Sequence, residues 1–328
     1  MNPTTLVIGA GIAGLLLARQ LHASGQPVTV LEKSRGVGGR MATKRVGAAV
    51  FDHGAQFFTA RTPDFAALAA TWAAQGLIRD WTSGPHPRYI GLDGMTAVPK
   101  RWAEGLDVRC EHQATAVRRN GDRWEVEIEN QPTLVGDRLV LAAPVAQSLA
   151  LLKAGGVTLP VDVESDLTGL GYHPCLALLV VLNEPSAVPA EGLAPPDGSI
   201  RWLADNTKKG ISPGVAAAVT LHARQEFSAA HYANSASEVA ALLLPEARPW
   251  LRGQVVSATL HRWRYSEPKA THRTPCVWLP ELTLGFTGDA FGGPKVEGAG
   301  SSGLALARLM DRITANPNAA DAATRSGG

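Results

Sequence analysis

The chain has 328 residues, 45% of them hydrophobic, which is enough to build two domains with separate cores. Its formal net charge is +2, so it lacks the positive surplus typical of nucleic-acid binding. Cys110, Cys175 and Cys276 have no metal-ligand spacing and form no full disulfide set, which favours a reducing cytoplasm and no metal site. No stretch reaches the roughly 18 uninterrupted apolar residues of a membrane span, and nothing indicates an obligate protein partner.

The first residues predict a strand, a tight turn and a helix. The run 6–8 is apolar without polar alternation, as expected of a strand buried on both faces of a parallel sheet. Three glycines follow in GxGxxG spacing: Gly9, Gly11 and Gly14. The first permits the turn, the second lets the backbone approach a pyrophosphate, and the third lets the helix pack on its strand. The helix, expected over 12–23, would direct the amides of Ile12 and Ala13 at the phosphates.

A second apolar run, 28–31, ends at Glu32, 18 residues past Gly14. An acid at the end of this strand can accept both hydroxyls of an adenosine ribose. Strand, helix, second strand and terminal acid together predict a dinucleotide-binding βαβ unit. The pattern leaves NAD and FAD open, because both place an adenosine ribose on such an acid.

The residues after Glu32 favour FAD. The stretch "EKSRGVGGR" runs through Lys33 and Gly39 to Arg40, a flexible turn that would bring a guanidinium back toward the phosphates. This element resembles one in the flavin amine oxidase and phytoene desaturase superfamily, where it helps to bind the FAD pyrophosphate. We therefore expect Lys33, Gly39 and Arg40 at the cofactor, although most charges of this stretch equally fit a solvated basic turn.

A second signal lies at residues 282–310, with a short strand, a Gly-Asp pair, a glycine-rich loop and an apolar helix from about 300 to 313. In FAD proteins of this architecture, the carboxylate after the strand contacts the ribityl hydroxyls. The following helix points its positive N-terminus at the flavin pyrimidine. We therefore expect Asp289 to be the ribityl ligand and the amides near Val296 to contact the pyrimidine.

The middle of the chain predicts a β-meander that belongs to the same domain. Asn120-Gly121 is a hairpin signal, 124–128 alternates as a half-exposed strand, and 139–142 returns as a buried strand. In dinucleotide oxidoreductases such a meander covers the adenosine half, which would place Val117 beside adenine.

These signals predict an α/β fold, a Rossmann-type FAD-binding domain with an inserted α+β substrate domain, as in amine oxidases. The FAD-binding domain is expected over 1–57, 95–148 and 283–315, and the substrate domain over 58–94 and 149–282. The substrate domain should include a helix with Phe65, Leu68 and Trp72 and another near 237–244 that Pro245 closes. The low apolar content of 316–328 predicts a disordered tail.

Six further stretches carry a closer resemblance. "SRGVGGRMATKR", "FDHGAQFFTAR", "YIGLDGM", "RWLADNTKKG", "HRWRYSEP" and "TGDAFGGPKVEGAGSSG" together resemble the renalase family, especially its bacterial branch, across almost the whole chain. The resemblance implies oxidation of 2- or 6-dihydro isomers of NAD(P), with hydride passing to flavin N5. NAD(P)+ is then the product, and reoxidation by dioxygen gives hydrogen peroxide. The substrate becomes an aromatic pyridinium, so the enzyme must position it and needs no strong base.

The expected site residues are therefore positioners. Asn206 matches the renalase Asn and could hold the nicotinamide carboxamide, or it could be a turn residue. Tyr265 stands where animal renalases carry His, while Trp263 and Arg264 alternate across the same strand. Trp202 could wall the pocket or belong to the core. Gln56 should lie near the flavin edge, His53 fits a packed loop histidine better than a catalyst, and Lys295 could meet a substrate phosphate or solvent.

Two alternatives stay open. The chain could be a flavin amine oxidase or desaturase acting on another small substrate, although its 6% aromatic content and modest length argue against an aromatic cage or a long tunnel. It could also bind FAD without turning over. FAD is expected to be non-covalent, because the last cysteine, Cys276, precedes the Gly-Asp element. The isomer, the choice between NAD and NADP, and the oligomeric state are left open.

Overall fold

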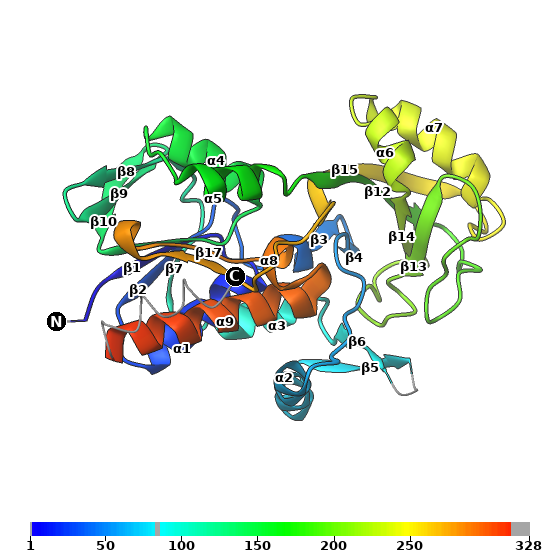
Figure 1. Ribbon diagram of the computed structural model, residues 1–328. Coiled ribbons are helices and arrows are strands. Elements are labelled where there is room, and N and C mark those ends of the chain that lie inside the picture. Colours follow the sequence, from blue (N-terminus) through cyan, green and yellow to red (C-terminus); the bar gives the residue numbers. More distant parts are fainter. Residues whose placement is uncertain (1, 83–85, 316–328) are drawn as a thin grey trace. The chain divides into compact units, whose positions relative to one another are not determined.

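A computed structural model describes residues 2–82 and 86–315 (Figure 1). The chain forms two compact units, each assembled from separate stretches. The first unit contains 1–39, 99–171 and the chain from 268 onward, and the second contains 40–98 and 172–267. Compactness does not assign function, so the functional boundaries expected from the sequence remain a prediction. The tail expected over 316–328 lies outside the described residues.

The first unit is built on a six-stranded sheet of order β16-β17-β11-β1-β2-β7. Its strands are β1 (Thr5–Ile8), β2 (Val28–Leu31), β7 (Asp107–Arg109), β11 (Arg138–Leu141), β16 (Val277–Leu279) and β17 (Leu284–Phe286). Neighbouring strands are parallel except for β16 and β17. From β1 the chain adds β2 on one side, and β11 lies on the other. The strand order therefore reverses at β1, where open α/β sheets bind ligands at the carboxyl ends of their strands.

The helices of the first unit are α1 (Ile12–Ala23), α4 (Val145–Ala154), α5 (Val161–Thr168), α8 (Asp289–Gly292) and α9 (Lys295–Ala315), while α3 (Ala97–Ala103) begins in the second unit and ends in the first. The expected helix 12–23 is confirmed, and Gly25 follows it with a positive φ of 72°. Figure 1 shows α1 and α9 side by side. Their approach is close, since a Cβ at Gly303 would lie 2.2 Å from the carbonyl oxygen of Ala13.

The sequence prediction was wrong about the start of the last helix. We expected a glycine-rich loop and a helix from about residue 300, but α8 and the first turn of α9 occupy that stretch. Gly298 is a poor helix former, yet a Cβ there would lie 1.9 Å from the carbonyl oxygen of Gly293. Tight packing therefore requires a glycine within the helix and overrides its low helix propensity.

The predicted meander is present as a three-stranded sheet of β8 (Ala114–Asn120), β9 (Arg123–Ile128) and β10 (Gln131–Gly136). Gly121 takes a left-handed φ of 57° in the hairpin turn, as the Asn-Gly signal predicts. Trp124, Val126 and Ile128 are buried on one face of β9, which confirms the predicted alternation.

The second unit has a four-stranded sheet of order β13-β14-β12-β15. These strands are β12 (Tyr172–Leu182), β13 (Ile200–Asp205), β14 (Ala217–Ala223) and β15 (Val255–Pro268). Two small antiparallel pairs join β3 (Thr43–Val46) to β4 (Ala49–Asp52) and β5 (Ile78–Thr82) to β6 (Arg88–Gly91). The helices are α2 (Pro63–Ala74), α6 (Gln225–Ala230) and α7 (Ala236–Ala247), with short 3-10 turns at Gly39–Met41 in this region and Pro280–Leu282 in the first unit.

Alternate side chains of β12 pack into two separate hydrophobic clusters, one on each face of this sheet. Leu178 and Val180 pack in one cluster with residues of α7 such as Leu243, whereas Leu179 and Val181 pack with residues of β4 such as Phe51. Successive side chains of a strand point to opposite faces, so α7 and β4 cover opposite faces of the sheet. This packing fixes the end of β4, which carries the polar residues described below.

The helix expected to close at Pro245 instead continues through Ala247. It begins with a capping box between Ser235 and Glu238, as a strong N-terminus should. Pro245 lies in the last turn, where it removes a single backbone hydrogen bond. Leu243 and Ala247 are fully buried in the core of the unit, so packing extends the helix past the proline.

Candidate functional site

The glycine turn of the first unit has the backbone geometry that its spacing predicts. Gly9 has a φ of 112°, which L side chains rarely adopt. A Cβ at Gly14 would lie 2.1 Å from the carbonyl oxygen of Gly9, so the helix and the turn touch there. A Cβ at Gly11 would meet no described heavy atom within 4 Å, and no described side chain caps α1 there. Space and unpaired amides at a helix N-terminus suit a phosphate.

Glu32 holds this turn in place. Its carboxylate is buried and accepts hydrogen bonds from the backbone amides of Ala10 (3.0 Å) and Ser34 (2.9 Å). A carboxylate has about four lone-pair sites, so each oxygen keeps the capacity to accept a ribose hydroxyl. The neighbouring Lys33 is exposed, and its expected cofactor contact remains a prediction.

The second glycine stretch returns to the first. The amide of Gly38 donates to the carbonyl of Ala10 at 2.8 Å, and a Cβ at Gly39 would lie 3.5 Å from the Cα of Gly11. The turn after Glu32 thus comes back to the GxGxxG loop. Arg40 belongs to the second unit, where its guanidinium donates to the carbonyl of Ser266 at 3.1 Å and lies 5.8 Å from the ring centre of Tyr172. Its contact with the phosphates remains a prediction.

The Gly-Asp element after β17 is anchored by α9. The hydroxyl of Ser302 accepts from the amide of Gly288 (3.0 Å) and lies 2.8 Å from the hydroxyl of Thr287. Asp289 follows at the start of α8 and is 5% exposed. Val296 is buried in the first turn of α9, and Lys295 before it is exposed.

Together, two buried carboxylates, an uncapped helix start and a glycine turn with open space fit a dinucleotide cofactor. Val117 is fully buried in β8. It lies against the C-terminal end of α4, because a Cβ at Gly155 would be 1.7 Å from the carbonyl oxygen of Val117. Its expected place beside adenine is not tested by these contacts.

The second unit contains a buried ion pair that sequence reasoning missed. Lys209 donates from Nζ to the carboxylate of Asp52 at 2.6 Å, and both side chains are fully buried. Asp52 also accepts from the hydroxyl of Thr43 and the amide of Met95, each at 2.8 Å. Burial lowers the pKa of Lys209, and the charge of Asp52 opposes this shift. Both residues stand inside the quoted stretches "FDHGAQFFTAR" and "RWLADNTKKG", but only the fold brings them together.

Gln56 is tied to the same pair. Its side-chain Nε2 donates to the carbonyls of Asp52 (2.5 Å) and Gly54 (3.2 Å), and Lys209 donates to its own carbonyl at 2.9 Å. Its Oε1 is buried and has no hydrogen-bond partner among the described residues. Turning the amide over would place an oxygen against two carbonyls, so the oxygen is left as an orphaned acceptor. An N–H or O–H group of a bound ligand would satisfy it.

Asn206 has a structural explanation within the protein. It is fully buried, its Oδ1 accepts from the amide of Asp52 (3.1 Å), and its Nδ2 donates to the carbonyl of Ala218 (2.9 Å) and the hydroxyl of Thr220 (3.0 Å). These bonds tie β4 to β14. They engage both ends of the amide, and the expected contact with a nicotinamide remains a prediction.

Trp263 belongs to a histidine cluster on the same unit. Its Nε1 donates to the carbonyl of His53 at 2.9 Å, and its ring stacks on that of His53 with centres 5.0 Å apart. His261 packs edge-on against His53, and Nε2 of His222 lies 3.0 Å from the same carbonyl. Burial lowers the pKa of His53 to about 3 and those of His222 and His261 to about 4. The cluster is therefore neutral at pH 7, which fits the packed loop histidine expected at His53.

The remaining expected positioners lie in two aromatic groups. Tyr265 packs edge-on against Tyr172, with ring centres 5.7 Å apart. Trp202 lies 5.6 Å from Phe57 and 6.2 Å from Trp81, and it is partly exposed rather than enclosed in the core. Neither finding tests a substrate contact.

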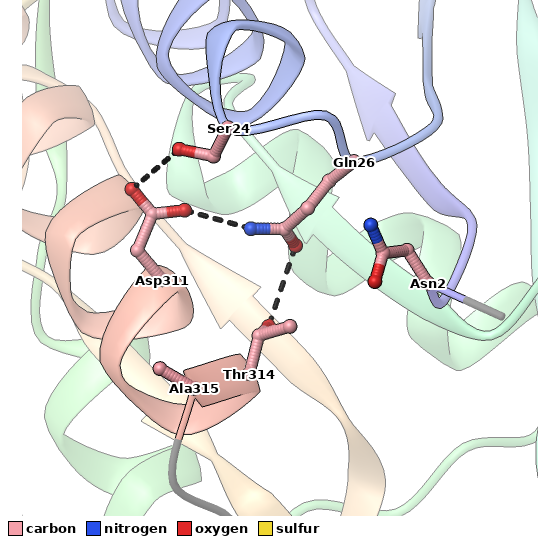
Figure 2. Close-up of a pocket in the computed structure, with 6 residues that line it drawn as sticks. All are labelled: Asn2, Ser24, Gln26, Asp311, Thr314 and Ala315. Carbon is pink, nitrogen blue, oxygen red and sulfur yellow. Dashed lines mark hydrogen bonds between the residues drawn. The ribbon is translucent and has the colours of Figure 1, made fainter.

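A hollow of about 280 Å³ lies elsewhere in the first unit, at the ends of α1 and α9 (Figure 2). It is lined by Asn2, Ser24, Gln26, Asp311, Thr314 and Ala315. Asp311 accepts from Gln26 (2.7 Å) and Ser24 (3.1 Å), and Thr314 donates to Gln26 at 3.4 Å. These hydrogen bonds join the end of α1 to the end of α9. Because the polar groups pair with one another, the hollow gives no indication of a ligand site.

The architecture defines a two-unit α/β protein with a dinucleotide-binding first unit, and comparison with known proteins gives its family. Residues 7–72 match the NAD(P)-binding Rossmann-like domain, and residues 74–310 match the flavin containing amine oxidoreductase domain. The chain belongs to the flavin-containing amine oxidoreductase family. These matches confirm the expected fold class and an oxidoreductase that uses a flavin.

Solved structures share the fold at low sequence identity. A protein provisionally assigned as a protoporphyrinogen oxidase from Exiguobacterium sp. 255-15 superimposes with a TM-score of 0.74 at 13% identity, over 95% of this chain and 99% of that one. Wild-type putrescine oxidase bound to putrescine gives a TM-score of 0.67 at 17% identity, over 97% and 99% of the two chains. At these identities the likeness shows the fold alone.

Curated relatives match over short segments. A 4-hydroxybenzoate brominase (decarboxylating) of Pseudoalteromonas luteoviolacea is 26% identical over 133 residues, which is 40% of this chain and 24% of the relative. Putrescine oxidase of Kocuria rosea is 43% identical over 63 residues, 19% of this chain and 13% of the relative. The chain thus spans a quarter or less of the length of these relatives. Within the described part of the chain, no helix combines the length and the apolar character that crossing a membrane requires.

Proposed function

We propose that this protein is an FAD-dependent oxidase of the renalase type, acting on 2- or 6-dihydro isomers of NAD(P). The observation that carries the proposal is the bonding between its two renalase-like stretches. Asp52, Lys209 and Gln56 form one buried network, and it leaves the Gln56 oxygen without a partner among the described residues. The residues that carry the resemblance to renalases thus build a buried network around an acceptor atom, Gln56 Oε1, that lacks a hydrogen-bond donor among the described residues.

The proposed cofactor is non-covalent FAD held mainly by the first unit. Glu32 would accept the adenosine ribose hydroxyls, the amides at the start of α1 would bind the pyrophosphate, and Asp289 would accept ribityl hydroxyls. When bound, FAD supplies a two-electron acceptor. Gln56 would offer its orphaned oxygen to a donor at the flavin edge.

The groups joined to this network suit hydride transfer better than proton abstraction. The carboxylate of Asp52 is already paired with Lys209, and the nearby histidines are neutral at pH 7. A dihydropyridine that loses hydride becomes a pyridinium, so no proton leaves carbon. The protein then has to hold the donor carbon in place and exclude water. Dioxygen would accept the two electrons with two protons and form hydrogen peroxide, in the cytoplasm and without a protein partner.

Amine oxidation is the second candidate, because the family match and the putrescine oxidase fold favour it. One experiment separates the two. The purified yellow protein is mixed anaerobically with 2-dihydro-NAD, 6-dihydro-NAD, ordinary 4-dihydro-NAD and putrescine, and the visible flavin band is followed. We expect one of the first two to bleach the band rapidly, with NAD+ formed and colour restored by air. Bleaching by putrescine alone would replace the proposal with amine oxidation, and no bleaching at all would favour a redox-silent protein.

The cofactor assignment has its own test. Asp289→Ala should purify with much less flavin than the wild type, because a buried ribityl acceptor is lost. The flavin-to-protein absorbance ratio measures this, with Asp122→Ala, which removes a fully exposed carboxylate from the turn between β8 and β9, as the control. A fully yellow Asp289→Ala protein would refute the ribityl role.

A further inference from the structure

Three aromatic side chains of the second unit form a cluster that the proposed chemistry does not use. Phe57, Trp81 and Trp202 lie with ring centres 5.6 to 6.2 Å apart. Their planes are inclined by 46° to 68°, so the rings meet at an angle rather than in a parallel stack. We call this group the aromatic cluster. All three side chains are partly exposed and therefore accessible to a ligand.

A cation lies on this cluster, and no described carboxylate forms an ion pair with it. The guanidinium of Arg88, from β6, is 4.5 Å from the ring centre of Phe57 and 5.4 Å from that of Trp202. In the described part of the chain, the structure gives this guanidinium no hydrogen bond and no ion pair. The buried Nε1 of Trp202 likewise has no acceptor among the described residues. Trp81 Nε1 donates to the carbonyl of Ala190 at 2.8 Å, so the donors of this cluster without a partner among the described residues are the Arg88 guanidinium and Trp202 Nε1.

The surrounding side chains add to this imbalance. Arg79, on the partner strand β5, donates to the carbonyl of Lys209 at 3.0 Å, and it forms no ion pair within the described residues. Lys209 lies 5.5 Å from the ring centre of Trp81, but its charge is compensated by Asp52, so the uncompensated positive charge comes from the two arginines. A cationic amine would be repelled here, whereas an anion with several acceptor oxygens would satisfy the unused donors.

The aromatic cluster is also joined to the position expected at the flavin edge. Lys209 donates to the carbonyl of Gln56, and Phe57 is the next residue along the chain. Within the second unit, one buried lysine thus contacts both the residue with the orphaned oxygen and the aromatic cluster. The guanidinium of Arg88 lies 4.5 Å from the ring centre of this neighbour, Phe57.

We propose that Arg88 and the aromatic cluster bind a phosphate-bearing part of the nucleotide substrate, with a planar base against the exposed rings. Arginine suits this role because its planar guanidinium can stack on an aromatic ring while donating two parallel hydrogen bonds to phosphate oxygens. Rings offer a base sequence-tolerant stacking. The proposal rests on the proposed function, and it adds the residue that recognises the nucleotide beyond its reacting ring.

The test separates binding from turnover. FAD-saturated protein is titrated with ADP, followed by calorimetry, for the wild type, Arg88→Gln and Arg88→Lys. Arg45→Gln, which removes an exposed arginine of β3, is the matched control. We expect Arg88→Gln to weaken ADP binding roughly tenfold or more, Arg88→Lys to weaken it less, and the control to leave it unchanged. Equal ADP affinities in the wild type and both Arg88 variants would overturn the proposal.

Kinetics then distinguish this proposal from the proposed function. With the active dihydro isomer, Arg88→Gln should raise KM for the dinucleotide and leave kcat unchanged. It should not alter KM for the corresponding dihydronicotinamide riboside, which has no phosphate. If the flavin is reduced with the same KM in Arg88→Gln and wild type, the function stands and this assignment fails. If neither isomer reduces the flavin but ADP binding depends on Arg88, the phosphate-binding role of Arg88 stands and the proposed function fails.

Discussion

The two units place their candidate sites by different means. In the first unit, glycines and backbone amides form the site, and Gly9, Gly11 and Gly14 act within six residues of one another. In the second unit, side chains far apart in the sequence meet, as when Lys209 reaches Asp52. A site made of local backbone geometry should be sensitive to added atoms, whereas a site made of long-range side-chain contacts should be sensitive to lost partners.

The largest expected effect is the loss of the Lys209 charge. Lys209→Met leaves the buried carboxylate of Asp52 without its cation, which should lower the free energy of unfolding by about 3–5 kcal/mol. Urea unfolding measures this, with Lys100→Met, a change at an exposed lysine of α3, as the control. Adding Asp52→Asn should recover part of the loss, because the buried charge is removed. Equal midpoints for the two lysine variants would show that the pair does not hold the second unit together.

In the first unit, a single added methyl group should have the next largest effect. Gly14→Ala places a Cβ against the carbonyl of Gly9, so we expect about 1–3 kcal/mol of destabilisation and a large loss of bound flavin. Gly36→Ala is the matched control, because a Cβ there would meet no described atom within 4 Å. The measurements are thermal unfolding and the flavin-to-protein ratio. A Gly14→Ala protein as yellow and as stable as the control would contradict the close-contact role.

The histidine cluster should make stability depend on pH. His53 has a pKa of about 3 in the folded chain and an ordinary value of 6.5, so the unfolded state binds more protons between these values. His53 alone should therefore lower the free energy of unfolding by about 2 kcal/mol between pH 7 and pH 5, and His222 and His261, with pKa values of about 4, should add to this fall. Urea midpoints at pH 7, 6 and 5 test this, and His53→Asn should reduce the slope while the share of His222 and His261 persists. An unchanged slope in the variant would exclude His53 as the source.

The smallest effect is expected at the Gly-Asp element. Ser302→Ala leaves the amide of Gly288 without its acceptor, which should cost about 1–2 kcal/mol and loosen flavin binding modestly. Ser301→Ala, the preceding residue of α9, serves as the control. Unfolding by urea and dialysis of bound flavin measure the two effects. If Ser302→Ala matches its control in both, the anchoring role of that hydroxyl is refuted.

Sequence reasoning worked where one segment carries its own constraint. The βαβ unit, the Asn-Gly hairpin and the alternation of Trp124, Val126 and Ile128 were predictable because each depends on neighbours within a few residues. It failed at the ends of two helices, since packing at Gly298 and around Pro245 overrides local preference. The sequence analysis assigned no role to Asp52, which lies in a quoted stretch, or to Arg88. Their partners lie elsewhere in the chain, so local patterns could not reveal these contacts.

The sequence by itself determined the cofactor-binding framework of this protein. Glycine spacing and a terminal acid are local features whose geometry follows from backbone sterics and hydrogen-bonding capacity. Only the tertiary structure decided which polar side chains of the second unit are paired and which are left open. The pairing of Asp52 with Lys209, the orphaned oxygen of Gln56 and the position of Arg88 on the aromatic rings all depend on long-range contacts. Burial makes those contacts energetically significant, and burial arises only when the chain has folded.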